Sequence, residues 1–184
     1  LPVVKLTPKT YNAGHVREDH STSSEQETLE LARSFAQRLE RGDVVALWGD
    51  LGTGKTRFVK GVCEAFGANH HVSSPSFIIL NRYEGKDPAK RELFVYHLDL
   101  YSVKSTEEIY DIGYEEFIYG DDITLVEWAE QLGDLLPPRR YDVRLAHGEA
   151  MRAQDFDRAY RYVENSVCHQ KGRARPMTIL GLET

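Results

Sequence analysis

The feature that most limits how this chain can fold is a glycine-rich segment from Gly49 to Thr56, with the sequence GDLGTGKT. It follows the short apolar run 44–48, which is typical of a buried strand, and precedes a helical apolar pattern that ends at Gly67. A strand that enters a helix through a tight glycine turn is the start of a β-α unit. The order of these segments therefore predicts an α/β fold.

The same segment matches the pattern G-x-x-x-x-G-K-[ST], which between a strand and a helix predicts a P-loop. Glycines let the backbone turn so that successive N–H groups and the positive end of the next helix converge on a phosphate. Lys55 adds a cation between the β- and γ-phosphates, and the Thr56 hydroxyl faces Mg²⁺. The predicted nucleotide-binding residues are Gly49, Asp50, Leu51, Gly52, Thr53, Gly54, Lys55 and Thr56.

This motif predicts ATP or ADP and Mg²⁺ as cofactors. It also predicts a three-layer P-loop NTPase fold, with a mostly parallel central sheet and antiparallel additions. The alternative is a glycine-rich strand-to-helix turn with an incidental lysine.

Two carboxylates are placed to hold the metal ion or its water shell. Asp99 ends the apolar run 94–98, and Glu127 ends the run 123–126. Both should emerge at the carboxyl edge of the sheet, where ligands bind in open α/β folds. The spacing does not rank them, and the alternatives are a turn or cap residue for Asp99 and a solvated charge for Glu127. The candidate metal ligands are Thr56, Glu127 and Asp99, and the catalytic candidates are Lys55, Glu127 and Asp99.

The remaining pattern divides the chain into three parts. These are an irregular N-terminal arm at 1–22, a P-loop ATPase domain at 23–153 and a C-terminal extension at 154–184 whose elements the pattern leaves undecided. Capping boxes at Ser24 and Ser105 predict two helix starts, the first helix running to Gly42. Further predicted strands are 77–83, 93–98, 123–126 and 141–145, with a turn at 84–88 between the first two.

A loop with the sequence Ser74-Pro75-Ser76 lies between the predicted P-loop helix and the next strand. Proline restricts its own φ and the preceding residue, so the loop could hold the Ser76 hydroxyl toward the γ-phosphate or Mg²⁺. Taken alone, the segment is better explained as a plain connection, because serine and proline are common in loops.

Composition excludes several classes of protein. Lys and Arg total 23 against 29 Asp and Glu, a net charge of −6, so any RNA contact is expected to be local or through a partner. No apolar run approaches the roughly 18 residues of a membrane helix, so no membrane role is expected. The two cysteines, Cys63 and Cys168, are too few for a disulfide framework and have no metal-ligand spacing. We therefore expect a cytoplasmic protein.

Taken together, four segments resemble the TsaE family of small P-loop ATPases, also called YjeE. They are Gly49 to Thr56, Ser74 to Phe77 (SPSF), Tyr96 to Tyr101 (YHLDLY) and Leu125 to Trp128 (LVEW), in this order and spacing. The resemblance extends from Ser24 to about Arg152. It implies a protein that helps to install the threonylcarbamoyl group on adenosine in tRNA (t6A), without being the transferase itself.

The resemblance also implies partners and residue roles. TsaE proteins act on a complex of TsaD, the transferase, with TsaB, so contact with tRNA is expected only through that complex. By this resemblance Lys55 and the loop hold phosphates, Thr56 and Glu127 the Mg²⁺ shell, and Asp99 a nearby supporting or metal-linked position. Further residues implied near the nucleotide are Ser76, Trp128, Ser23 or Ser24, and Arg152.

Two residues depart from the family pattern. Ser76 stands where the family usually has Thr, which keeps the hydroxyl and removes a methyl group. Ser102 stands where the family often has Arg, so any charge contact from that position is missing or supplied elsewhere.

Alternative interpretations remain open at this stage. Trp128 could be a core aromatic residue, and His97 is expected to pack or form a hydrogen bond rather than to catalyse. A P-loop kinase for a nucleoside or other small molecule would share the first half of the chain, but no Arg-rich lid stands out between Glu127 and Tyr141. A nucleotide-dependent binding module without hydrolysis would keep the P-loop and could dispense with Glu127.

Overall fold

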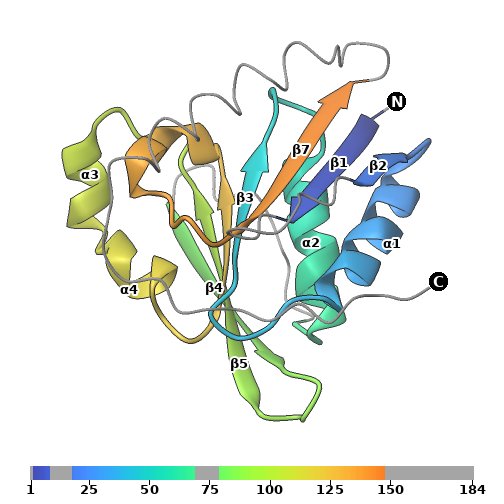
Figure 1. Ribbon diagram of the computed structural model, residues 1–184, viewed down its shortest axis with the longest axis horizontal. Helices are drawn as coiled ribbons and strands as arrows, with labels where there is room; N and C mark the ends of the chain where they lie inside the picture. Colours follow the sequence, from blue (N-terminus) through green and yellow to red (C-terminus); the bar gives the residue numbers. More distant parts are fainter. Residues whose placement is uncertain (1, 9–17, 69–78, 148–184) are drawn as a thin grey trace.

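A computed structural model describes residues 2–8, 18–68 and 79–147. Within these ranges the centre is a seven-stranded sheet of order β2-β1-β7-β3-β6-β5-β4 (Figure 1). The strands are β1 (Pro2–Pro8), β2 (Glu18–Ser21), β3 (Val44–Trp48), β4 (Leu80–Lys86), β5 (Glu92–Asp99), β6 (Ile123–Glu127) and β7 (Tyr141–His147). Strands β7, β3, β6 and β5 are parallel, whereas β1, β2 and β4 add antiparallel pairs. The predicted sheet type is confirmed.

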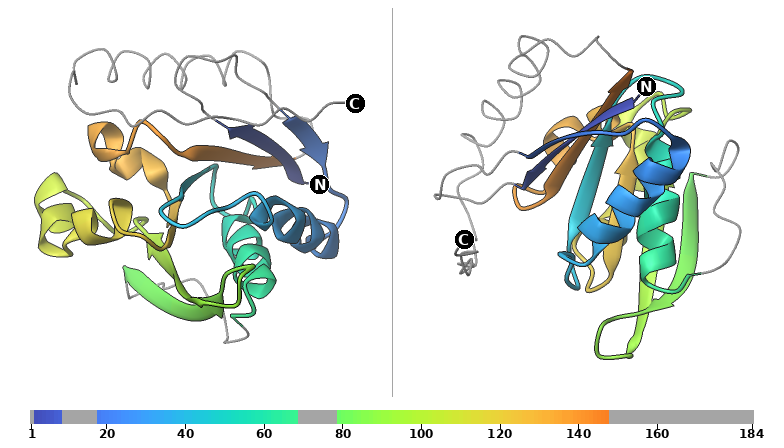
Figure 2. Two further views of the ribbon diagram at one scale, coloured as in Figure 1. Left: turned by 60° about the horizontal axis from the view of Figure 1, so that its bottom comes forward. Right: turned by 90° about the vertical axis from the view of Figure 1, so that its right-hand side faces the viewer.

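Helices cover both faces of the sheet and complete three layers (Figures 1 and 2). On one face lie α1 (Glu25–Ala36) and α2 (Lys55–Ala65). On the other lie α3 (Thr106–Asp111), α4 (Tyr114–Ile118) and the 3₁₀ turns η1 (Ala129–Gln131) and η2 (Gly133–Leu135). The central strand β3 is apolar throughout (VVALW), as is typical of a strand with both faces buried, and all five residues of β6 are buried as well. None of the helices within the described ranges is long and apolar enough to cross a membrane.

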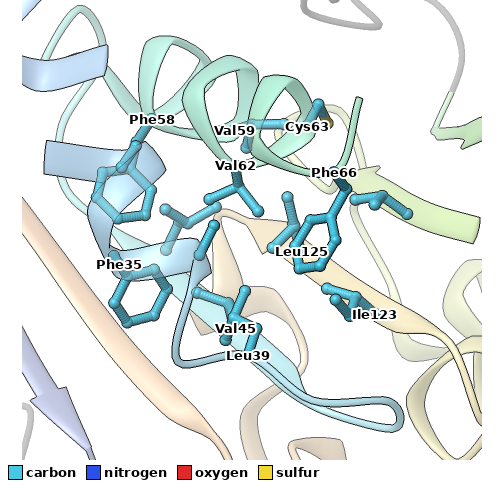
Figure 3. Close-up of a cluster of buried hydrophobic side chains, with 14 of the residues drawn as sticks. Phe35, Leu39, Val45, Phe58, Val59, Val62, Cys63, Phe66, Ile123 and Leu125 are labelled. Atoms are coloured by element: carbon cyan, nitrogen blue, oxygen red, sulfur yellow. The ribbon is translucent and has the colours of Figure 1, made fainter. Parts of the chain in front are cut away.

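The larger core lies between the sheet and the two helices of the first layer. Figure 3 shows side chains of α2, including Phe58, Val62 and Cys63, above Val45 of β3 and Leu125 of β6. Side chains alternate along each strand, so Val45 belongs to this core while its neighbour Val44 belongs to the core of the opposite face.

Close packing of α1 against α2 depends on a glycine. A Cβ at Gly61 would lie 2.6 Å from Ala32 Cβ and 2.7 Å from the Leu29 carbonyl oxygen. The rings of Phe35 and Phe58 meet nearby, with centroids 5.5 Å apart. This contact fixes the position of α2 and therefore of the loop that precedes it.

The first helix begins as predicted and ends earlier than predicted. Ser24 is its N-cap, and the Ser24 hydroxyl accepts a hydrogen bond from the Glu27 N–H at 3.1 Å. The helix stops at Ala36, because the N–H groups of the next residues, up to Leu39, bond to carbonyls three residues back. Leu39 is still buried, so its apolar spacing survives although the α-helix does not continue to Gly42.

The expectation of an irregular segment at 1–22 is wrong for two stretches. β1 pairs antiparallel with β7 along its whole length, from Pro2 opposite His147 to Pro8 opposite Tyr141, and β2 pairs with β1. The two prolines stand at the ends of β1, where a missing N–H is tolerated best. Hydrogen bonds to a distant part of the chain create this strand, so the local pattern does not reveal it.

The predicted hairpin exists with shifted boundaries. β4 continues through Lys86, and the chain reverses at 87–91, where the Asp87 N–H donates to the Arg91 carbonyl at 3.0 Å. Gly85 lies within β4 rather than in a turn. A Cβ there would be 2.7 Å from the Phe66 carbonyl oxygen, so this glycine admits the end of the P-loop helix.

Candidate nucleotide-binding site

The glycine-rich loop joins β3 to α2 as predicted, and its shape requires glycine at specific positions. Gly49 has a φ of 138°, and a Cβ there would lie 2.2 Å from the Leu145 carbonyl oxygen of β7. Gly52 and Gly54 also have positive φ, at 80° and 98°. The left-handed region is open to glycine at little cost and strained for other residues. The loop backbone thus turns tightly and lies so close to β7 that residue 49 has no room for a side chain.

α2 starts directly after this turn without a side-chain cap at its N-cap residue. Its N-cap is Gly54, which makes no side-chain cap hydrogen bond, and its first turn contains no acidic residue. The first N–H groups of a helix lack carbonyl partners within the helix and carry its positive end. A loop and helix start of this kind provide a site for an anion.

The side chain of Lys55 folds back over the loop. Its Nζ donates to the carbonyl oxygens of Gly49, at 2.5 Å, and Asp50, at 2.9 Å. Burial lowers the pKa of Lys55, while the negative charge of Glu127 opposes that shift. Among the described residues, no carboxylate oxygen lies within ion-pair distance of Nζ. This ammonium group can therefore accept an anionic partner.

Glu127 is the carboxylate that contacts the loop. It ends β6 and is 2% exposed. The Thr56 hydroxyl donates to Glu127 Oε2 at 3.1 Å, and His97 Nε2 lies 2.9 Å from Glu127 Oε1. Thr56, one of the candidate metal ligands, therefore contacts the carboxylate that ends β6. Glu127 is buried, and the alternative of a solvated charge is wrong.

Asp99 lies beside Glu127 at the same sheet edge. The two residues are register partners in the parallel pair of β5 and β6. One oxygen of Asp99 accepts the Tyr101 N–H at 3.1 Å, and the residue is 7% exposed. The structure thus brings both predicted carboxylates together and gives the Thr56 contact to Glu127.

Trp128 turns back toward the loop because of its backbone conformation. Its φ of 57° and ψ of 47° are left-handed values that are strained for a non-glycine residue. The ring centroid lies 3.9 Å from Lys55 Nζ and 4.9 Å from the centroid of Tyr101. Trp128 therefore lies beside Lys55 of the loop, and its ring also packs against the second core.

The donors gathered here fit a nucleotide with a divalent cation. Mg²⁺ prefers oxygen ligands, and the Thr56 hydroxyl and the Glu127 carboxylate supply them beside the helix start. Lys55 and the first N–H groups of α2 supply positive charge for phosphates. Among the described residues, no three His, Cys, Asp or Glu side chains surround one point, so these residues by themselves offer no cage for a metal ion. Mg²⁺ is usually held in this way, by few protein ligands together with phosphates and water.

Comparison with known proteins now identifies the family. Residues 22–155 match the family described as threonylcarbamoyl adenosine biosynthesis protein TsaE. The chain belongs to the TsaE family. The tRNA threonylcarbamoyladenosine biosynthesis protein TsaE of Rickettsia conorii is 42% identical over 127 residues, covering 68% of this chain and 69% of that one. The Bacillus subtilis protein of the same name is 37% identical over 123 residues, covering 66% and 73%.

A solved structure agrees with these sequence relatives. The crystal structure of Bacillus subtilis YdiB has a TM-score of 0.55 and 28% identity, covering 80% of this chain and 92% of that one. The TsaE fold of this chain is accordingly the P-loop NTPase fold that the motif predicted.

Three other residues were predicted from the TsaE resemblance. Ser23 lies before α1, where its N–H and hydroxyl both bond to the Glu27 carboxylate, at 2.6 and 2.5 Å. Near Ser23, the starts of α1 and α2 lie side by side, because Arg57 of α2 forms an ion pair with Glu25 of α1. Ser76 and Arg152 fall in the matched range but outside the described residues, so their predicted roles stay predictions.

Two contacts of the site were not predicted from the sequence. His97 was expected to pack or bond somewhere in the core, and the structure places it on the Glu127 carboxylate. Tyr101 was quoted only as part of a motif, and its ring lies against Trp128. The alternation of side chains along a strand could have predicted the first contact. Residues 97 and 99 share one face of β5, and the parallel register pairs residue 99 with residue 127 of β6.

Proposed function

We propose that this TsaE protein is a Mg²⁺-dependent ATPase of t6A formation, acting in the cytoplasm on a complex of TsaB- and TsaD-type proteins. The observation that carries the proposal is the Thr56–Glu127 contact at 3.1 Å, beside a P-loop whose Lys55 contacts two carbonyl oxygens and an aromatic ring among the described residues. Family membership supplies the t6A context.

In this proposal the reaction is transfer of the γ-phosphoryl group to water. The bond from γ-phosphorus to the bridging oxygen breaks as water oxygen attacks, and ADP and phosphate are released. Lys55 and the N–H groups at the start of α2 stabilise negative charge on the phosphates. The Glu127 carboxylate and the Thr56 hydroxyl would hold Mg²⁺ or its water shell. When bound, the cation supplies neutralisation of charge on the β- and γ-phosphates.

The surface beside the site supports dependence on a partner. Leu51, in the P-loop, is 71% exposed, and Tyr101, against Trp128, is 60% exposed. Large apolar side chains at this exposure are suited to burial by another protein. Slow hydrolysis by the free protein is expected, with the partner completing the site.

The proposal is tested by ATP hydrolysis with and without Mg²⁺, by the protein alone and with the TsaB–TsaD heterodimer of the same organism. Stimulation by the heterodimer that is lost in Lys55→Ala is the expected result. Binding of ATP without turnover in either condition would contradict the ATPase proposal and favour a nucleotide-gated binding module. Phosphorylation of an added nucleoside would favour a kinase instead.

A further inference from the structure

The Glu127 carboxylate is held from two sides in a region closed to solvent. Thr56 approaches Oε2 from the P-loop helix, and His97 approaches Oε1 from β5. His97 is 0% exposed and Glu127 is 2% exposed. A buried carboxylate without such partners would be costly, so His97 and Thr56 both offset the cost of burying Glu127.

The hydrogen-bond partners determine which nitrogen of His97 carries the proton. An ionised carboxylate only accepts hydrogen bonds, so Nε2 must donate to Glu127 Oε1. Nδ1 is buried and has no hydrogen-bond partner among the described residues, which fits an acceptor without a proton better than a stranded donor. The ring is therefore assigned the Nε2–H tautomer.

The His97 ring is itself fixed by its surroundings. It lies 6.4 Å from the ring of Tyr83, centroid to centroid, and nearly parallel to it. Tyr83 belongs to the core under α2. The torsion that orients a glutamate carboxylate is broad, and Thr56 alone would leave it free to turn. A rigid donor on Oε1 removes that freedom.

We propose that His97 is a positioning residue that holds the Glu127 carboxylate through Oε1, so that Oε2 stays directed at Thr56 and the P-loop. This inference rests on the proposed ATPase function for its catalytic consequence, and on the structure for the contact itself. Partners of this kind behind a metal-binding group typically change metal affinity or activity by about 10- to 100-fold.

A pair of substitutions separates positioning from packing. His97→Leu fills similar space without a donor, whereas His97→Gln can place an amide N–H near the position of Nε2. Tyr83→Phe is the matched control, because it removes only the hydroxyl of the ring stacked on His97 and leaves Glu127 in place. We expect His97→Leu to lower partner-stimulated kcat by about 10- to 100-fold with the Kd for ATP within about twofold of wild type. His97→Gln should recover most of this loss, and Tyr83→Phe should retain wild-type turnover. Equal losses in folded Leu and Gln variants, or wild-type turnover in His97→Leu, would overturn the proposal.

A spectroscopic measurement tests the contact without any turnover. In a long-range ¹H–¹⁵N NMR spectrum of the full chain, His97 should show the Nε2–H tautomer, and Glu127→Gln should shift its Nε2 signal while Tyr83→Phe leaves the tautomer unchanged. An Nδ1–H tautomer in the wild type, or no response to Glu127→Gln, would overturn the positioning role. If these signals appear as expected but no hydrolysis is found with the heterodimer, the ATPase proposal fails while the contact stands.

Discussion

The ammonium group of Lys55 lies 3.9 Å from the centroid of the Trp128 ring. Lys55 begins α2, whereas Trp128 follows the end of β6, and the left-handed backbone of Trp128 turns its ring toward the P-loop. A cation over an aromatic face is stabilised by about 0.5–2 kcal/mol, less than a charged hydrogen bond to phosphate can supply. Lys55 can thus exchange this contact for a nucleotide.

Lys55→Ala is expected to weaken nucleotide binding without unfolding the protein. The substitution removes a charge-assisted contact of about 1.5–3 kcal/mol, which corresponds to a Kd increase of about tenfold or more. Lys60→Ala is the matched control on the same helix, because Lys60 is half-exposed and its distance to Glu64 is 3.9 Å. Titration calorimetry with ADP and Mg²⁺ measures both variants. Equal affinities for the two variants would contradict the assigned role of Lys55.

Nucleotide binding should change the fluorescence of Trp128. If Lys55 moves from the Trp128 ring to phosphate, the charge next to the indole changes and its emission should respond. Trp128→Phe keeps Trp48 as the remaining tryptophan, and the Nε1–H of Trp48 donates to Asp142 at 3.0 Å. We expect an emission change on adding ADP to the wild type and almost none in Trp128→Phe. A change that persists in the variant would assign the signal to Trp48.

Gly49→Ala should destabilise the fold far more than Gly67→Ala. Both glycines have positive φ, but a Cβ at Gly49 would lie 2.2 Å from the Leu145 carbonyl oxygen, whereas a Cβ at Gly67 would have no atom within 4 Å. Backbone strain alone costs about 1–2 kcal/mol at Gly67, and overpacking adds about 1–3 kcal/mol at Gly49. Urea unfolding measures the free energy of unfolding of each variant. Similar losses of unfolding free energy in the two variants would mean that β7 does not limit the space for a side chain at residue 49.

Cys63 should make the fold less stable as the solution becomes alkaline. Burial raises the pKa of this thiol from its ordinary 9.0 to about 12. Above pH 9 the unfolded chain loses the thiol proton while the folded chain keeps it, so the folded state binds more protons and stability falls as pH rises. The loss continues until the pH reaches the folded pKa, with a slope of up to about 1.4 kcal/mol per pH unit.

The control for this prediction is Cys63→Ala, which removes the titrating group and lowers stability by a constant amount. Tyr141, whose raised pKa does not depend on Cys63, contributes the same slope to both proteins and cancels in the comparison. Urea unfolding at about pH 8 and about pH 10.5 should show a steeper loss in the wild type than in Cys63→Ala. Parallel losses would contradict the burial of the thiol.

Local chemistry in the sequence was sufficient for the parts of the fold that short-range interactions determine. The glycine pattern predicted the turn from β3 into α2, because only glycine adopts the required φ at Gly49 without strain. The Ser24 cap and the continuous apolar runs located α1 and the central strands in the same way. The two acidic strand ends could be predicted as a pair because parallel strands end at one edge.

Tertiary structure alone decided which groups meet. Thr56 and Glu127 touch because α2 packs on the face that carries residue 127, a relation that depends on the register of β3, β5 and β6. The strand at Pro2–Pro8 forms because β7 supplies its hydrogen-bond partners, although its own sequence looks irregular. Trp128 turns toward Lys55 through one strained backbone conformation that residue type does not reveal. Each is a contact between segments far apart in the chain, and its energy is realised only when the whole sheet has assembled.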